Sequence, residues 1–355
     1  MLAWLAACRS AGVAAPTLPV AGQITLIPPA PATVAATPAA TLLPPTGTPM
    51  ETPSTPTPSP TPDPYAGWTI EELAAREFGG PGVVLGERVL GDARFTQYKM
   101  HYESDGLTIT GLANIPAGEG PFPVIVVNHG YGSPAVYYPG YDSAAIGNTL
   151  AVYGYIALMP DYRGYGGSDK GPNPFRIGYA VDVMNLVAQA GSLPQAAEGQ
   201  IGVIGHSMGG GVSLWPMVLQ DEVDAVVLYA AMSGDIAESW RYIRLMWDPE
   251  AMQEEVAALG TPDENPAWYV AASPTEHLDR VSMPVMIHHG TDDRQVPFEW
   301  SAELAEALAA AGKDVTFHAY EGAAHSFAGE TFRQFISRSI AFFDQYVRGA
   351  SSTSP

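Results

Sequence analysis

A serine flanked by glycines stands at the end of a run of apolar residues, in the segment VIGHSMGG (203–210). The apolar run predicts a buried strand. Gly205 and Gly209 allow a sharp turn after it, because neither carries a Cβ atom that would clash with the neighbouring strand and helix. A strand–turn–helix elbow of the form G-x-S-x-G holds a serine hydroxyl exposed near a helix N-terminus. The segment therefore predicts that Ser207 is a nucleophile.

The histidines after this serine include a candidate for the general base. A serine hydroxyl is a weak nucleophile and needs a base, which in turn needs an acid to orient it. On such an elbow, the acid and then the histidine follow the serine along the chain. His288 and His289 fall within an apolar run, and His318 lies in the middle of another predicted strand. His325 lies in YEGAAHSF, a loop from which an imidazole can reach the elbow, so we predict His325 as the base.

Two neighbouring aspartates are candidates for the orienting acid. The acid is expected in the loop after the strand that precedes the histidine loop. That loop reads TDDRQVP (291–297) and contains Asp292 and Asp293. Spacing alone leaves the choice between them open.

Two backbone N–H groups are candidates for stabilising the oxyanion of a tetrahedral intermediate. One belongs to Met208, the residue after the nucleophile. The other is expected in the loop NHGYGSP (128–134), which follows the first long apolar run, and Tyr131 is the expected donor. A plain glycine turn is the alternative interpretation of that loop.

Alternating strand and helix patterns provide the elements that must position these residues. Six short apolar runs between 123–130 and 314–320 suit strands buried on both faces of a parallel sheet, and helical patterns separate most of them. The stretches 95–102 and 107–115 read as an antiparallel hairpin. The sequence therefore predicts an α/β fold, with a mostly parallel sheet of about eight strands flanked by helices.

The stretch from about 235 to 278 interrupts this alternation. It carries Trp240, Ile243 and Trp247 at helical spacing, which predicts an inserted helical lid. Packing of these side chains against the body of the domain is a more ordinary role for them than contact with substrate.

The first 64 residues differ in composition from the rest of the chain. Residues 10–64 are mostly Ala, Pro, Thr, Ser, Gly and Val, which indicates an extended linker before a folded domain at 65–350. The single cysteine, Cys8, ends the sequence LAAC, which resembles a bacterial lipoprotein box. We therefore expect residues 1–9 to be a lipoprotein-type leader with a lipid anchor, and the protein to be extracytoplasmic, in the cell envelope or secreted. A chance cysteine in a short apolar leader is the alternative.

The charge balance and the remaining motifs exclude several classes of partner. A formal net charge of −21 argues against nucleic acid and anionic membrane surfaces. His288 and His289 are adjacent on a strand and point to opposite faces, so they cannot share one metal ion. The segment DYRGYGGSD (161–169) lacks the order of a phosphate-binding or dinucleotide-binding loop. We therefore expect neither a metal nor a cofactor.

Several segments together carry a family resemblance: PFPVIVVNHGYGSP, LMPDYRGYGGSD, GQIGVIGHSMGG, SPTEHLDRVSMPVMIHHGTDDRQVP and YEGAAHSF. Spanning about 95–347, they resemble the catalytic domain of the prolyl oligopeptidase family and its single-domain esterase relatives. The resemblance implies an α/β-hydrolase fold. The pattern HG-x-x-D-x-x-V-P of α/β-hydrolases matches Asp293, so the resemblance implies a triad of Ser207, Asp293 and His325 that forms an acyl-enzyme.

The sequence departs from the family pattern in two places. Prolyl oligopeptidases carry a β-propeller, for which residues 65–94 offer neither length nor repeated blades. The family's oxyanion tyrosine corresponds to either His129 or Tyr131. We therefore predict hydrolysis of small carboxylic esters, with a propeller-less peptidase of the aminopeptidase or acylaminoacyl type, acting on short peptides, as the alternative. A non-catalytic surface-binding lipoprotein is a third interpretation, and the complete order of serine, acid and histidine argues against it.

Overall fold

The computed structural model of the protein describes residues 65–349. The predictions for the leader, for Cys8 and for the linker at 10–64 concern residues outside this range and stay predictions. Within 65–349, no helix combines the length and the apolar character needed to cross a membrane. The same residues contain no group of three or more His, Cys, Asp or Glu side chains placed to hold a metal ion.

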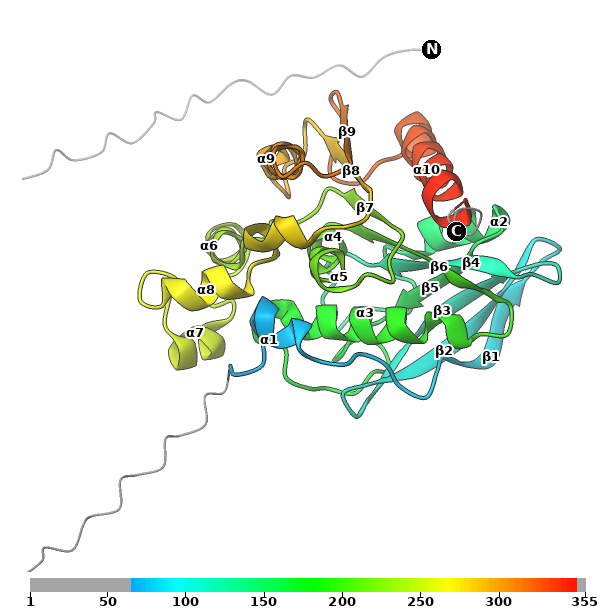
Figure 1. Ribbon diagram of the computed structural model, residues 1–355, viewed down its shortest axis with the longest axis horizontal. Coiled ribbons are helices and arrows are strands. Elements are labelled where there is room, and N and C mark those ends of the chain that lie inside the picture. The colour runs from blue at the N-terminus through cyan, green and yellow to red at the C-terminus, as the bar shows by residue number, and fades with distance from the viewer. Residues whose placement is uncertain (1–64, 350–355) are drawn as a thin grey trace, which may run out of the picture. The chain divides into compact units, whose positions relative to one another are not determined.

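A nine-stranded sheet, in the order β1-β2-β3-β5-β4-β6-β7-β8-β9, forms the centre of the described fold (Figure 1). The pairs from β1 through β2 and β3 to β5 are antiparallel, and all later pairs are parallel. The predicted α/β fold with a mostly parallel sheet is therefore confirmed. The strands are β1 (Val84–Gly91), β2 (Phe95–Ser104), β3 (Leu107–Pro116), β4 (Phe122–Asn128), β5 (Ile156–Pro160), β6 (Ala196–His206), β7 (Ala225–Tyr229), β8 (Val285–Gly290) and β9 (Val315–Tyr320).

The predicted hairpin corresponds to β2 and β3, whereas β1 is the strand that the sequence did not reveal. Asp105 and Gly106 form the hairpin turn with φ angles of 53° and 76°, the conformation favoured by a two-residue Asp-Gly turn. Strand β1 is exposed along nearly its whole length and pairs with β2 through two register shifts. It has no buried face, so it lacks the apolar periodicity from which a strand is predicted.

Helices cover both faces of the sheet. Side chains of α3 and α9 pack with Val124 and Val126, whereas those of α2 and α10 pack with Ile125 and Val127 on the opposite face. This alternation explains why the parallel strands are apolar throughout. The helices in this body are α1 (Ile70–Ala74), α2 (Ala144–Val152), α3 (Ile177–Gln189), α4 (Met208–Val212), α5 (Leu214–Leu219), α9 (Phe298–Ala310) and α10 (Gly329–Phe343), with short turns η1 (Pro174–Arg176), η2 (Ala190–Ser192) and η4 (Asp344–Arg348).

The first of these helices is fixed by local capping. The Thr69 hydroxyl accepts a hydrogen bond from the N–H of Glu72, and the Glu72 carboxylate accepts one from the N–H of Thr69. This reciprocal pair is a capping box, which satisfies two of the N–H groups at the start of the helix.

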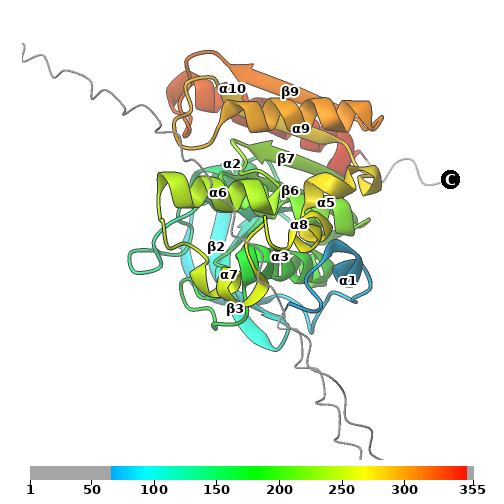
Figure 2. The same cartoon turned by 90° about the vertical axis from the view of Figure 1, so that its left-hand side faces the viewer.

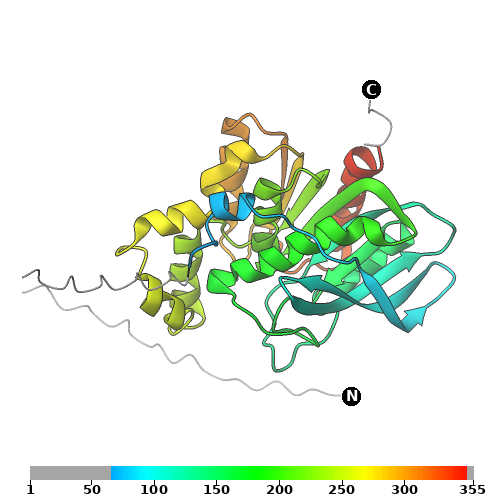
Figure 3. The same ribbon diagram turned by 60° about the horizontal axis from the view of Figure 1, so that its bottom comes forward.

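A helical insertion lies between β7 and β8. It consists of α6 (Ile236–Met246), α7 (Gln253–Leu259), α8 (Pro266–Ala272) and the turn η3 (Pro274–Arg280). In Figure 2 these helices gather in one group, and Figure 3 shows that group at the opposite end of the domain from the cyan β2 and β3. Trp247, which directly follows α6, lines the same cleft as Ser207, so the insertion lies near the end of the sheet where β6 delivers the elbow serine.

Candidate active site

Ser207 occupies a strained turn between β6 and α4. Its φ and ψ angles are 55° and −118°, a conformation that residues with a side chain rarely adopt. Its N–H donates to the carbonyl oxygen of Tyr229 at 2.9 Å, and its own carbonyl oxygen accepts from Gly211 and Met232 at 3.1 and 3.0 Å. These backbone bonds hold the turn in place against the strain.

The two glycines of the elbow are required by close backbone approach. A Cβ atom on Gly209 would overlap the carbonyl oxygens of Asn128 and His129, and one on Gly205 would overlap the carbonyl oxygen of Gly209. The turn therefore packs directly on the end of β4. This contact brings the loop after β4 beside Ser207, as the predicted oxyanion site requires.

Asp293, rather than Asp292, lies beside the predicted base. The Asp293 Oδ2 atom accepts a hydrogen bond from His325 Nδ1 at 2.7 Å, and its side chain is fully buried. Asp292 instead lies on the surface and pairs with Arg294 at 3.3 Å. The structure thus separates two neighbours that spacing alone left equivalent.

Four hydrogen bonds keep the Asp293 carboxylate ionised. Its Oδ1 atom accepts from the backbone N–H groups of Gln295 at 2.8 Å and Val296 at 3.0 Å. Its Oδ2 atom accepts from His289 and His325. Burial by itself raises the pKa of Asp293, but these hydrogen bonds outweigh it and hold the pKa well below its usual range.

His289 is a site residue that the sequence analysis assigned only to the sheet. Its Nε2 lies 3.0 Å from Asp293 Oδ2, and its Nδ1 lies 2.7 Å from Ser301 Oγ. A carboxylate only accepts hydrogen bonds, so Nε2 carries the proton, and Nδ1 can accept from the Ser301 hydroxyl. The four-residue spacing of His289 and Asp293 was visible in the sequence, but the turn that brings them together was not.

His325 is nearly buried and lines the same cleft as Ser207. Burial lowers the pKa of its imidazole below the ordinary value, and the hydrogen bond that Nδ1 donates to Asp293 offsets part of this effect. The ring is therefore neutral near pH 7. With Nδ1 bound to Asp293, the other ring nitrogen is left to accept a proton.

Ser207 and His325 line one open cleft of about 350 Å³. Tyr131 lies in the same cleft and is half exposed, and Met208 begins α4, where the first N–H groups have no acceptor within the helix. Trp247 also lines it, although packing against the body was the more ordinary expectation for this residue. The lining residues are Gly130, Tyr131, Tyr141, Asp142, His206, Ser207, Trp247, Gln295, His325 and Ser326.

The loop after β4 presents Tyr131 to the cleft and turns His129 away from it. The His129 side chain is fully buried, with Nδ1 at 2.7 Å from the Gly130 carbonyl oxygen and Nε2 at 3.2 Å from that of Asp161. Its ring stacks on Tyr162 at a centroid distance of 4.3 Å. Of the two residues that the resemblance left as equivalents of the family tyrosine, only Tyr131 faces the cleft.

A second carboxylate–imidazole pair, which the sequence analysis missed, lies next to the first. Asp142 Oδ2 is 2.7 Å from His206 Nδ1 and also accepts from the Gly130 N–H at 2.8 Å. His206 Nε2 faces the backbone carbonyl oxygen of His325 at 3.2 Å. The pair therefore ties the loop after β4 to the histidine loop across the elbow.

The fold and the cleft together define the class of the protein as a serine hydrolase with the α/β-hydrolase fold. The model of the prolyl oligopeptidase family matches residues 144–350, more than half of the chain. The chain therefore belongs to the prolyl oligopeptidase family, and the resemblance predicted from the sequence is confirmed.

Known relatives include proteins named as peptidases and as esterases. The uncharacterized peptidase YtmA of Bacillus subtilis is 24% identical over 240 residues, covering 67% of this chain and 90% of the relative. The esterase YjfP of Escherichia coli is 25% identical over 240 residues, covering 64% of this chain and 90% of the relative. Among solved structures, the acylaminoacyl peptidase of Pyrococcus horikoshii is similar in fold, with a TM-score of 0.57 and 23% identity; the match covers 71% of this chain and 41% of that one. This chain thus spans nearly the whole length of the first two relatives but about two-fifths of the third.

Proposed function

We propose that this protein hydrolyses small carboxylic esters through an acyl-enzyme on Ser207. The observation that carries the proposal is the strained elbow serine sharing a cleft with an imidazole that a buried carboxylate orients. A strained backbone at a cleft marks a functional site more often than a structural one. The esterase relative, which this chain matches over 90% of its length, supports the ester as substrate.

The proposed reaction uses each group in turn. His325 takes the proton of Ser207 as the serine oxygen attacks the ester carbonyl, and Asp293 stabilises the resulting imidazolium. The backbone N–H groups of Met208 and Tyr131 stabilise the oxyanion. His325 then gives the proton to the leaving alcohol, and water releases the acyl group by the same steps in reverse.

Peptide hydrolysis is the second candidate function. The peptidase relative of similar length and the family itself favour it, and the same groups would serve an amide as well as an ester. The difference lies in the leaving group, because an amine must be protonated before it departs. The two candidates therefore differ in rate on matched substrates rather than in the residues used.

A comparison of two substrate types tests the proposal. The expected result is a kcat/KM on p-nitrophenyl butyrate that exceeds the value on alanyl and acetyl-alanyl p-nitroanilide by about 100-fold or more. Comparable or faster turnover of either anilide would contradict the ester assignment and identify a peptidase. The anilide with the faster turnover would then distinguish the aminopeptidase from the acylaminoacyl type.

An extracytoplasmic position, with a lipid on Cys8, belongs to the same proposal. The sequence LAAC and the linker composition at 10–64 support it. Radioactive palmitate is expected to label the protein in bacterial cells, and the Cys8→Ser variant is expected to stay unlabelled. Equal labelling of both proteins, or of neither, would argue against the anchor.

A further inference from the structure

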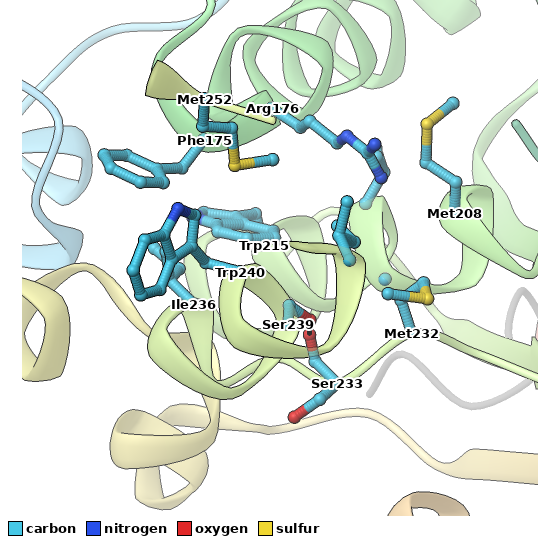
Figure 4. A pocket seen from close by; sticks show the side chains of 13 residues that line it. Phe175, Arg176, Met208, Trp215, Met232, Ser233, Ile236, Ser239, Trp240 and Met252 are labelled. Atoms are coloured by element: carbon cyan, nitrogen blue, oxygen red, sulfur yellow. Dashed lines mark hydrogen bonds between the residues drawn. The ribbon is translucent and has the colours of Figure 1, made fainter. Parts of the chain in front are cut away.

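A second cavity adjoins the elbow beneath α6. Its walls are mostly apolar and come from η1, α4, α5 and α6, with Phe175, Met208, Trp215 and Trp240 among them. Figure 4 shows these side chains around the cavity, together with Arg176. We call this space the elbow cavity. It encloses about 40 Å³ that water-sized molecules can reach, or roughly three water positions, which suits a short chain of carbons.

The elbow cavity and the catalytic cleft are bordered by residues that adjoin one another. Met208, which lines it, directly follows Ser207 in the chain. Tyr131, which lines the catalytic cleft, lies under the Arg176 guanidinium at 5.5 Å from its ring centroid. A substrate whose carbonyl carbon lies at Ser207 can therefore place its acyl chain in this cavity.

Polar hydrogen-bond donors in the cavity lack acceptors. Within residues 65–349, no hydrogen bond or ion pair involves the Arg176 guanidinium; it lies over the Tyr131 ring, and its charge also acts on the hydroxyl groups of Tyr165 and Tyr179. The indole nitrogens of Trp215 and Trp240 are buried and also lack a partner in this part of the chain. A buried donor without an acceptor costs about 1–3 kcal/mol, which applies to the two indole nitrogens. The Arg176 guanidinium is only partly buried but adds an unpaired positive charge, so the cavity suits a ligand that carries acceptor atoms.

The backbone that carries the arginine is strained. Phe175 and Arg176 have consecutive positive φ angles of 47° and 70°. Each such residue costs about 1–3 kcal/mol and persists where the surroundings enforce it, most often at ligand sites. Figure 4 shows the Arg176 side chain extending towards Met208, whereas Trp215 and Trp240 lie at the other end of the cavity beside Phe175. The strained backbone thus places the positively charged Arg176 side chain on the Met208 side of the cavity, which is nearest Ser207.

We infer that the substrate's acyl group is short and carries a carboxylate that Arg176 binds, so that the substrates are monoesters of short dicarboxylic acids. This inference rests on the proposed ester hydrolysis. The chain has a net charge of −21, which disfavours binding of an anion elsewhere on it. An unpaired guanidinium at the acyl cavity therefore favours the binding of an anionic acyl group over a neutral one. A guanidinium binds a carboxylate through two parallel hydrogen bonds, which also fix the orientation of the chain.

Two ethyl esters with acyl chains of equal length test the inference. Ethyl hydrogen succinate ends in a carboxylate where ethyl butyrate ends in a methyl group, and ethanol release measures both. The unmodified protein is expected to show a kcat/KM on the succinate ester about 10-fold or more above that on the butyrate ester. In the Arg176→Gln variant this ratio is expected to fall by about 10- to 100-fold.

Another arginine variant provides the matched control. Arg241 lies in the insertion itself, on α6, and its guanidinium pairs on the surface with Asp263 at 2.8 Å. Arg241→Gln is expected to keep the substrate ratio of the unmodified protein. A fall in that ratio equal to the fall in Arg176→Gln would overturn the inference, because the effect would then follow net charge rather than the cavity.

The remaining outcomes separate the inference from the function on which it rests. If the unmodified protein hydrolyses ethyl butyrate as fast as the succinate ester, or if Arg176→Gln slows both esters equally, the inference is overturned and ester hydrolysis stands. If neither ester is hydrolysed and a fluorophosphonate does not label Ser207, the proposed function fails and the inference fails with it.

Discussion

Replacing Ser207 by alanine is expected to reduce kcat on p-nitrophenyl butyrate by about 10⁵- to 10⁶-fold. The variant keeps the backbone donors around the elbow, so weak stabilisation of the oxyanion remains, but it has no atom that can form the acyl-enzyme. The backbone bonds that hold the turn do not involve the serine side chain. The loss is therefore expected without unfolding, as the melting temperature will show.

Covalent labelling gives an independent readout of the same variant. A fluorophosphonate is expected to add one phosphonyl group to the unmodified protein, at Ser207 by peptide mass spectrometry, and none to Ser207→Ala. Ser282→Ala, which removes an exposed serine before β8, is expected to label normally. Full labelling of Ser207→Ala, or retained ester turnover, would show that another residue is the nucleophile. An unlabelled, inactive but folded native protein would favour the non-catalytic binding interpretation.

Replacing Asp293 by asparagine is expected to lower kcat by about 10⁴-fold at neutral pH. The carboxylate accepts hydrogen bonds from two imidazoles, His289 and His325, through one oxygen atom. An asparagine amide presents either an oxygen or a donating N–H₂ group there, so it no longer holds His325 with the proton on Nδ1 and stabilises the imidazolium only weakly. The expected loss therefore appears in kcat.

The neighbouring aspartate supplies the matched control. Asp292→Asn removes the same charge one residue away, from a side chain that pairs with Arg294 on the surface. It is expected to change kcat by less than about threefold. Equal losses in the two variants would show that the field of the whole loop, rather than the contact with His325, controls the rate.

The dependence of kcat/KM on pH, measured for the native enzyme and for Asp293→Asn, is expected to shift in a defined direction. His325 acts as a base only when it is neutral, so kcat/KM rises as the pH rises through its pKa. Burial lowers that pKa, so the acid limb of the native enzyme is expected below about 6.5, the ordinary value for histidine. The contact with Asp293 acts against burial and raises the pKa of His325. Without the carboxylate this pKa falls further, so the residual activity of Asp293→Asn is expected to have its acid limb at still lower pH. A limb that moves to higher pH would contradict the proposed pairing.

Local sequence patterns were sufficient to place the elbow, the histidine loop and the parallel strands. The elbow depends on glycines, an apolar strand and a helix that follow one another directly in the chain. The segment GHSMGG and its neighbours are therefore sufficient to predict the turn at Ser207. The runs that became β4 to β8 are apolar because helices cover both of their faces, whereas β9 is a partly exposed edge strand. Strand β1 was not predicted from the sequence, because it is exposed beside β2 and has no buried face that would require alternating apolar residues.

Spacing alone could not distinguish residues that are neighbours in the chain; the family resemblance favoured Asp293, and the tertiary structure shows the contact that separates it from Asp292. Asp292 and Asp293 have the same side chain, and the direction of one turn decides which of them meets His325. His129 and Tyr131 differ in the same way, because one points into the body and the other into the cleft.

Contacts between segments that are distant in the chain could not be predicted from the sequence. Asp142 meets His206 across 64 positions. Arg176 meets Tyr131 because η1 and the loop after β4 converge at the end of the sheet. Periodicity reports which face of an element is buried, but it carries no information about which element lies opposite. The sequence by itself therefore determined the chemistry available to this protein, whereas the packing of its loops decided which charged groups face the substrate.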